Sequence, residues 1–84
     1  MGTKVVMLTG SRCAECTKLK NRLNSGGLVG KYEELSVETE EGLSMAKSLG
    51  VRSIPVLVEM NEGLVVQTIT GSSYEISKYK ELFN

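Results

Sequence analysis

The sequence predicts an α/β fold: a four-stranded mixed sheet with three helices, in the order β-α-β-α-β-β-α. An almost continuous apolar run near the N-terminus is typical of a strand that is covered on both faces. Later segments carry apolar residues at helical spacing, with charged residues on their other faces. Two β-branched runs in the second half are separated by a short loop containing Gly, which indicates a hairpin.

In the first half, the apolar run at residues 4–9 is the expected central strand. The segment 10–12 breaks it, and a helix is predicted to begin near Cys13, because apolar residues then recur every three or four positions. Two glycines within residues 24–27 end this helix. Imperfect alternation at residues 32–37 predicts a second strand nearer an edge of the sheet.

In the second half, Thr39 is a typical cap for a helix of about ten residues, with acids in its positive first turn and Gly50 at its end. Pro55 then opens a third strand that runs to residue 60, because Pro in a strand's first position removes no interior ladder bond. Residues 61–63 predict a three-residue loop, and residues 64–70 predict the fourth strand.

A last amphipathic helix is predicted after the hairpin. Ser72 and Glu75 have the spacing of a capping box, which would open a helix extending through Phe83. A strand-helix-strand unit needs a parallel pair of strands, whereas a hairpin is antiparallel, so the sheet must be mixed. Residues 1–84 show no linker or repeat and are expected to form one domain.

Composition excludes several classes of function. Ten Lys and Arg balance ten Glu, and this net charge of zero argues against a nucleic-acid partner, which needs a basic face. The chain has no His, which removes Ser-His and Cys-His nucleophile pairs and His-based zinc sites. No stretch approaches the ~20 apolar residues of a membrane span. We therefore expect a cytoplasmic protein with no membrane partner.

The two cysteines, Cys13 and Cys16, lie three residues apart where a strand gives way to a helix. Cysteines with this spacing can form a disulfide that also opens readily. Cys13 lies at the helix N-terminus beside Arg12, so unpaired N–H groups and positive charge are expected to lower the pKa of its thiol from about 8.5 to about 7. Glu15 acts in the opposite direction if its carboxylate lies close. Cys13 is therefore the candidate nucleophile, and the more buried Cys16 is the candidate resolving thiol.

Three other interpretations of the cysteine pair remain open. Zinc takes four ligands, and two thiols without His do not complete such a set within one chain. A metal or iron–sulfur site shared between two chains through Cys13 is the main alternative. An inert, structural pair is the third. We expect no metal in a single chain.

The Cys13-Ala14-Glu15-Cys16 motif after a strand, Ser53-Ile54-Pro55 before a hairpin, and Gly71 before the last helix together resemble the thioredoxin superfamily. In length and element order the whole chain is similar to glutaredoxin and to the glutaredoxin-like donors to ribonucleotide reductase. It departs from glutaredoxins in having Ala14 and Glu15 where Pro and Tyr are frequent. It also lacks the Trp and the Asp that thioredoxins usually carry.

The resemblance implies a thioredoxin-like fold and a dithiol-disulfide oxidoreductase of electron transport and cell redox homeostasis, with a redox-active disulfide between Cys13 and Cys16. It implies that Pro55 is cis and that the backbone of Ile54 pairs with an extended substrate. The substrate surface would be formed by a set of residues around the motif: Arg12, Ala14, Glu15, Ser53, Ile54, Pro55, Gly71 and Ser72.

The resemblance also implies partners. We expect a protein with a disulfide as substrate, ribonucleotide reductase being one candidate, and glutathione or a thioredoxin reductase as electron donor. No bound cofactor is expected, glutathione being a reductant, and the chain is expected to be a monomer. The Ser72 hydroxyl and the N–H groups of the last helix offer a place for a carboxylate such as that of glutathione, although Ser72 is more simply explained as a helix cap.

Overall fold

The computed structural model describes residues 3–83 and confirms the predicted order of elements. A four-stranded sheet has the strand order β2-β1-β3-β4; β1 and β2 are parallel, and the other two pairs are antiparallel. The elements are β1 (Thr3–Thr9), α1 (Ala14–Ser25), β2 (Glu33–Ser36), α2 (Glu40–Leu49), β3 (Val56–Asn61), β4 (Leu64–Thr70), α3 (Ile76–Lys80) and the 3₁₀ turn η1 (Glu81–Phe83).

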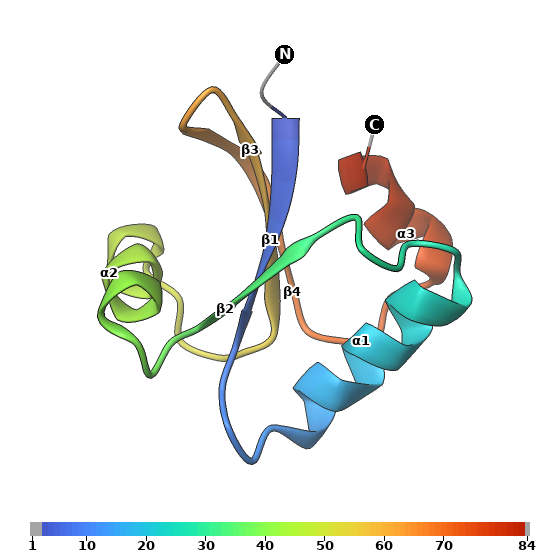
Figure 1. The fold of residues 1–84 in the computed structure, drawn as a ribbon, viewed down its shortest axis with the longest axis horizontal. Helices are drawn as coiled ribbons and strands as arrows, with labels where there is room; N and C mark the ends of the chain where they lie inside the picture. Colours follow the sequence, from blue (N-terminus) through green and yellow to red (C-terminus); the bar gives the residue numbers. More distant parts are fainter. Residues whose placement is uncertain (1–2, 84) are drawn as a thin grey trace.

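Helices cover both faces of the sheet. In Figure 1, α1 and α3 lie on one side of the strands and α2 lies on the other. β1 is an interior strand, as its apolar run predicts, and successive side chains point to opposite faces. Val5 and Met7 are buried with α1 and α3, whereas Val6 and Leu8 are buried with α2.

The helix boundaries follow the predicted signals in the first two helices. Cys13 is the N-cap of α1 and Thr39 is the N-cap of α2, whose first turn donates an N–H from Gly42 to the Thr39 hydroxyl. Gly50 ends α2 in the left-handed conformation, with a φ of 69° that favours glycine. β2 lies at an edge of the sheet, as expected.

Two local predictions are wrong. The hairpin loop has two residues rather than three, because Asn61 still pairs with Leu64 and both Glu62 and Gly63 have positive φ, the geometry of a type I′ turn. The last helix begins at Ile76 with Glu75 as its N-cap, and η1 replaces its final turn. Ser72 is therefore not the cap of α3.

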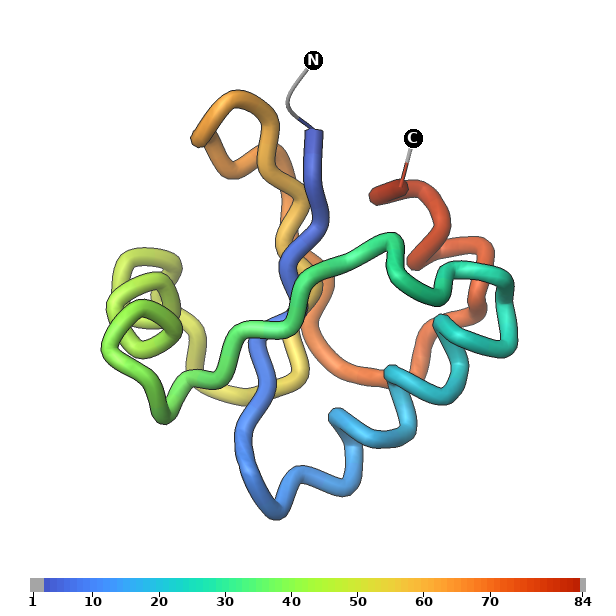
Figure 2. The backbone as a smooth tube through the Cα atoms, in the orientation of Figure 1, coloured from blue at the N-terminus to red at the C-terminus, as the bar shows by residue number. Residues whose placement is uncertain are grey.

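The topology brings four loops to one end of the sheet. The carboxyl ends of β1, β2 and β4 point the same way as the start of β3, because β1 and β2 are parallel and β3 runs against β1 and β4. The loop after β1 and the loop before β3 lie together at this end of the chain trace (Figure 2). Both predicted motifs, the cysteine pair and Ser53-Ile54-Pro55, are in or beside these loops.

Candidate active site

A disulfide joins Cys13 and Cys16 at the start of α1, with their Cα atoms 5.2 Å apart. Cys13 is partly exposed, whereas Cys16, one turn into the helix, is 2% exposed. Leu19 and Leu23 extend the same face of α1 into the core. The buried stripe thus fixes the helix, which leaves Cys13 partly exposed and buries Cys16.

The backbone at the start of α1 provides one hydrogen-bond donor to the Cys13 sulfur. The Cys16 N–H donates to Cys13 Sγ at 3.1 Å, and this bond makes Cys13 the side-chain cap of the helix. The first N–H groups of a helix have no partner in its own ladder, and the helix dipole is positive there. A thiolate on Cys13 would therefore lie against N–H groups that stabilise negative charge.

Arg12 and Ala14 flank Cys13 as the sequence predicts. Arg12 has a φ of 57°, a left-handed conformation that few non-glycine residues adopt, and this residue turns the chain from β1 into α1. Both residues are exposed. A recess at the disulfide is lined by Thr9, Gly10, Arg12, Cys13, Ala14, Cys16, Thr17 and Lys20.

The loop before β3 lies against this region. The Ile54–Pro55 peptide bond is cis, as the resemblance implies, and Pro55 is buried. A Cβ added to Gly10 would lie only 2.8 Å from Ile54 Cδ1, so Gly10 is the small residue that lets the two loops approach. The Gly71 N–H donates to the Pro55 carbonyl at 2.8 Å, which attaches the loop after β4. Ser53 is exposed, and no contact of its side chain with the cysteines is seen.

Ser72 joins the site in a way that the capping interpretation did not predict. Its hydroxyl donates to Glu15 Oε1, and Ser72 itself is 6% exposed. This bond is the main cause that lowers the pKa of Glu15. The positive charge of Lys18 is the second cause, and its Nζ lies 3.6 Å from Glu15 Oε2. The carboxylate of the residue between the cysteines is thus held by Ser72 and Lys18.

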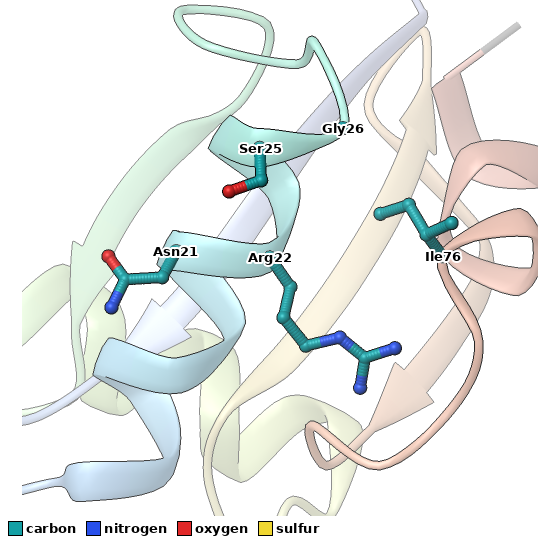
Figure 3. Close-up of a pocket in the computed structure, with 5 residues that line it drawn as sticks. All are labelled: Asn21, Arg22, Ser25, Gly26 and Ile76. Atoms are coloured by element: carbon teal, nitrogen blue, oxygen red, sulfur yellow. The ribbon is translucent and has the colours of Figure 1, made fainter.

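The loop that carries Ser72 is fixed from beneath by α1 and α3. Arg22 Nη1 donates to the Ser72 carbonyl at 2.6 Å, and Figure 3 shows the Arg22 side chain extending from α1 toward the chain segment that precedes Ile76. The fully buried Tyr79 donates its hydroxyl to the Gly71 carbonyl at 2.8 Å. These bonds keep residues 71–74 out of the helix, which explains why α3 begins late.

Glu38 is a residue at the site that the sequence did not indicate. Its Oε2 accepts bonds from the Ser11 N–H at 2.8 Å and from the Ser11 hydroxyl at 2.6 Å. These bonds, first the side-chain one and then the backbone one, lower the pKa of Glu38. Glu38 directly precedes the predicted cap Thr39, and no local pattern predicts a contact with a residue 27 positions earlier.

The described part of the chain, residues 3–83, holds no cluster of three or more Cys and Glu side chains suited to a metal ion. Within the same residues, none of the helices has the length and apolar character needed to cross a membrane. Cys13 and Cys16 are the only thiols in the sequence, and the disulfide uses both.

Comparison with solved structures identifies thioredoxins as similar, although no protein-family model and no curated protein sequence matches the chain. Thioredoxin f of spinach chloroplast has a TM-score of 0.75 at 21% identity, over 98% of this chain and 73% of its own. The thioredoxin of Thermus thermophilus has a TM-score of 0.72 at 24% identity, over 96% and 71%. That of Malassezia sympodialis reaches 0.74 at 17% identity, over 96% and 71%.

These similarities establish the fold. The chain has the thioredoxin fold, its disulfide-forming Cys13-Cys16 pair lies at the N-terminus of α1, and the loop before β3 contains a cis proline, Pro55. The predicted fold class is therefore confirmed.

Proposed function

We propose that this protein is a dithiol-disulfide oxidoreductase in which Cys13 is the nucleophile and Cys16 the resolving thiol. The observation that carries the proposal is the unequal exposure of two cysteines joined at a helix N-terminus: Cys13 is partly exposed and its sulfur accepts an N–H bond, whereas Cys16 is buried. A disulfide that merely braced the fold would have no need of this asymmetry.

The reaction begins from the dithiol form. The Cys13 thiolate attacks one sulfur of a substrate disulfide, which forms a mixed disulfide and releases the other substrate sulfur as a thiolate. Cys16 then gives its proton to solvent and attacks Cys13 Sγ. The Cys13–Cys16 disulfide forms, the second substrate thiolate leaves, and two electrons have passed from the protein to the substrate.

The chain can carry out this chemistry without a His. The nucleophile needs a thiolate, and the N–H groups at the start of α1 stabilise one, with Arg12 adjacent in sequence. The same stabilisation makes Cys13 a good leaving group when Cys16 resolves the mixed disulfide. The lack of a general base is therefore compatible with the proposed reaction.

Substrate binding is proposed for the loops around the disulfide. The backbone of Ile54 would pair with an extended substrate while Pro55 shapes the groove, and the approach of Ile54 to Gly10 supports this role. Arg12 and Ser53 are exposed in these loops, and Ala14 is exposed at the start of α1. The Ser72 hydroxyl already donates to Glu15, so a ligand carboxylate would have to displace Glu15 to use it.

The partners follow from the same proposal. We propose a protein disulfide as substrate, with ribonucleotide reductase as one candidate, and glutathione or a thioredoxin reductase as electron donor. The proposed setting is a monomer in the cytoplasm. The glutaredoxin type is supported by length and element order, and the thioredoxin type by the Ser53-Ile54-Pro55 stretch.

The test is reduction of insulin by the purified protein, with glutathione and glutathione reductase or with a thioredoxin reductase as the electron source. Wild-type protein should accelerate the reaction with one of the two, and that one assigns the type. Cys13→Ser should abolish the acceleration. If wild-type protein is inactive with both and, purified without oxygen, absorbs visible light as an iron–sulfur protein does, the shared-cluster alternative replaces this proposal.

A further inference from the structure

Glu38 links the segment after β2 to the loop that delivers Cys13. Within residues 3–83, two side-chain hydrogen bonds join residues 10–12 to a distant part of the sequence. Ser11 is the donor in both, and Glu38 Oε2 is the acceptor in both. Ser11 is two positions before Cys13, and Arg12 between them has the left-handed φ of 57°. One carboxylate oxygen thus joins this exposed loop to the segment after β2.

The segment that carries Glu38 is itself held firmly. The Val37 N–H donates to the Thr9 carbonyl at 2.8 Å, and the Glu38 N–H donates to the Ser36 hydroxyl at 3.0 Å. Behind it, a Cβ on Gly42 would lie 1.8 Å from the Ser36 carbonyl oxygen, so the start of α2 packs directly on this segment. Glu38 therefore holds the loop to a rigid support.

The same carboxylate also borders the Pro55 loop. The point where a Gly10 side chain would begin is 2.8 Å from Ile54 Cδ1 and 3.5 Å from Glu38 Oε2. Glu38 thus lies where the loop of residues 10–12 approaches the loop that contains Ile54 and Pro55. Movement of Ser11 away from Glu38 would change the distance between Cys13 and the surface proposed for substrate.

We propose that Glu38 is a positioning residue for Cys13: through Ser11 it holds the nucleophile at the cap of α1 and in register with the Ile54–Pro55 loop. This inference rests on the proposed function. Small displacements of a reacting atom reduce rates strongly.

The hydrogen bonds can be separated from the charge. Both bonds end on a single oxygen, and the carbonyl oxygen of a Gln side chain has two lone pairs that can accept both. Glu38→Gln therefore removes the charge and keeps the link, whereas Glu38→Ala removes both. A difference between these two variants reports positioning alone. Glu41→Ala, at an exposed Glu in the first turn of α2, is the matched control for loss of a nearby charge.

The experiment measures the rate at which iodoacetamide alkylates Cys13 in the reduced protein across a pH series, together with insulin reduction and thermal unfolding. We expect Glu38→Ala to lower alkylation at neutral pH and kcat/KM for insulin by about five- to tenfold. Its alkylation should also have a higher pH midpoint than that of Glu38→Gln, because the thiolate loses its fixed N–H partners. Glu38→Gln and Glu41→Ala should stay within about twofold of wild type.

Equal alkylation rates and equal pH midpoints in Glu38→Ala and Glu38→Gln would overturn the inference. So would a rate loss in Glu38→Ala that only accompanies unfolding, which the thermal transition reveals. Failure of the proposed function would be distinguishable from failure of this inference. In that case wild-type protein itself would not reduce insulin, regardless of the alkylation rates of the variants.

Discussion

The two faces of the sheet are covered to different degrees. On the α1 and α3 face, nine buried residues form one cluster, with Leu19, Leu23, Tyr79 and Leu82 fully buried. On the α2 face, the buried cluster has five members, and most of its helix contacts come from partly buried side chains such as Met45 and Leu49. One helix covers a surface that on the other side is covered by two.

The active-site elements divide between these faces. Cys16 lies in α1 on the well-covered face and Cys13 is the N-cap of that helix, whereas the Ile54–Pro55 loop and Glu38 come from the α2 side. The disulfide is thus supported by the larger buried cluster, on the α1 and α3 face. The Ile54–Pro55 loop is supported by the smaller cluster, on the α2 face. Buried side chains supply the support on one side, and loop hydrogen bonds supply much of it on the other.

Matched leucine truncations test this comparison most strongly. Leu23→Ala on α1 removes a fully buried side chain and should lower the free energy of unfolding by about 3 kcal/mol. Leu49→Ala on α2 removes a half-buried one and should lower it by about 1 kcal/mol. Urea unfolding measures both. Equal losses would mean that the two faces are equally well packed.

A second prediction concerns the loop that the dense face supports. Tyr79→Phe keeps the ring but removes the hydroxyl that donates to the Gly71 carbonyl and accepts from the Tyr74 N–H. We expect a loss of about 1–2 kcal/mol, because both backbone groups lose their partner. Hydrogen exchange should rise at the Tyr74 amide. Unchanged exchange there would show that the hydroxyl does not hold the loop.

A smaller effect is expected at the link between the motif and this loop. Ser72→Ala removes the bond that does most to lower the pKa of Glu15, so that pKa should rise toward its ordinary value of 4.5. Carbon-detected NMR titration of the Glu15 carboxyl measures the change, and Ser73→Ala, at an exposed neighbour, is the control. An unchanged titration in Ser72→Ala would contradict the contact.

The smallest effect is a pH dependence on the α2 side. The bonds from Ser11 lower the pKa of Glu38 below 4.5, so the stability that they contribute is present above that pH and is lost as pH falls through the lowered value. The Tm of Ser11→Ala should lie slightly below that of wild type at neutral pH, and the gap should narrow as the pH falls below 4.5. A Tm difference that increases at acidic pH would contradict this prediction.

Local patterns in the sequence were sufficient for the fold. The apolar run of β1 predicts an interior strand because both of its faces are buried, and Thr39 and Gly50 bound α2 through contacts within a few residues. The late start of α3 could not be predicted in this way. Ser72 has the spacing of a cap, but contacts with Glu15 and Arg22, more than 45 positions away, hold it in the loop.

The candidate site was predictable to a similar extent. The spacing and position of the two cysteines predict their disulfide, and the resemblance predicts the cis peptide bond at Pro55. The role of Gly71 as a donor to Pro55 and that of Glu38 as an acceptor from Ser11 depend on loops that only the sheet topology brings together. The residues next to Gly71 and Glu38 in the sequence do not indicate these roles.

The central claim is that Cys13 and Cys16 have different roles, and trapping of a mixed disulfide tests it most directly. Reduced Cys16→Ser and Cys13→Ser proteins are each mixed with oxidised glutathione and analysed by mass spectrometry. We expect Cys16→Ser to gain one glutathione on Cys13, because Cys13 is partly exposed and its sulfur accepts an N–H bond. Cys13→Ser should stay unmodified, because Cys16 is buried. Equal modification of the two variants would contradict the assignment.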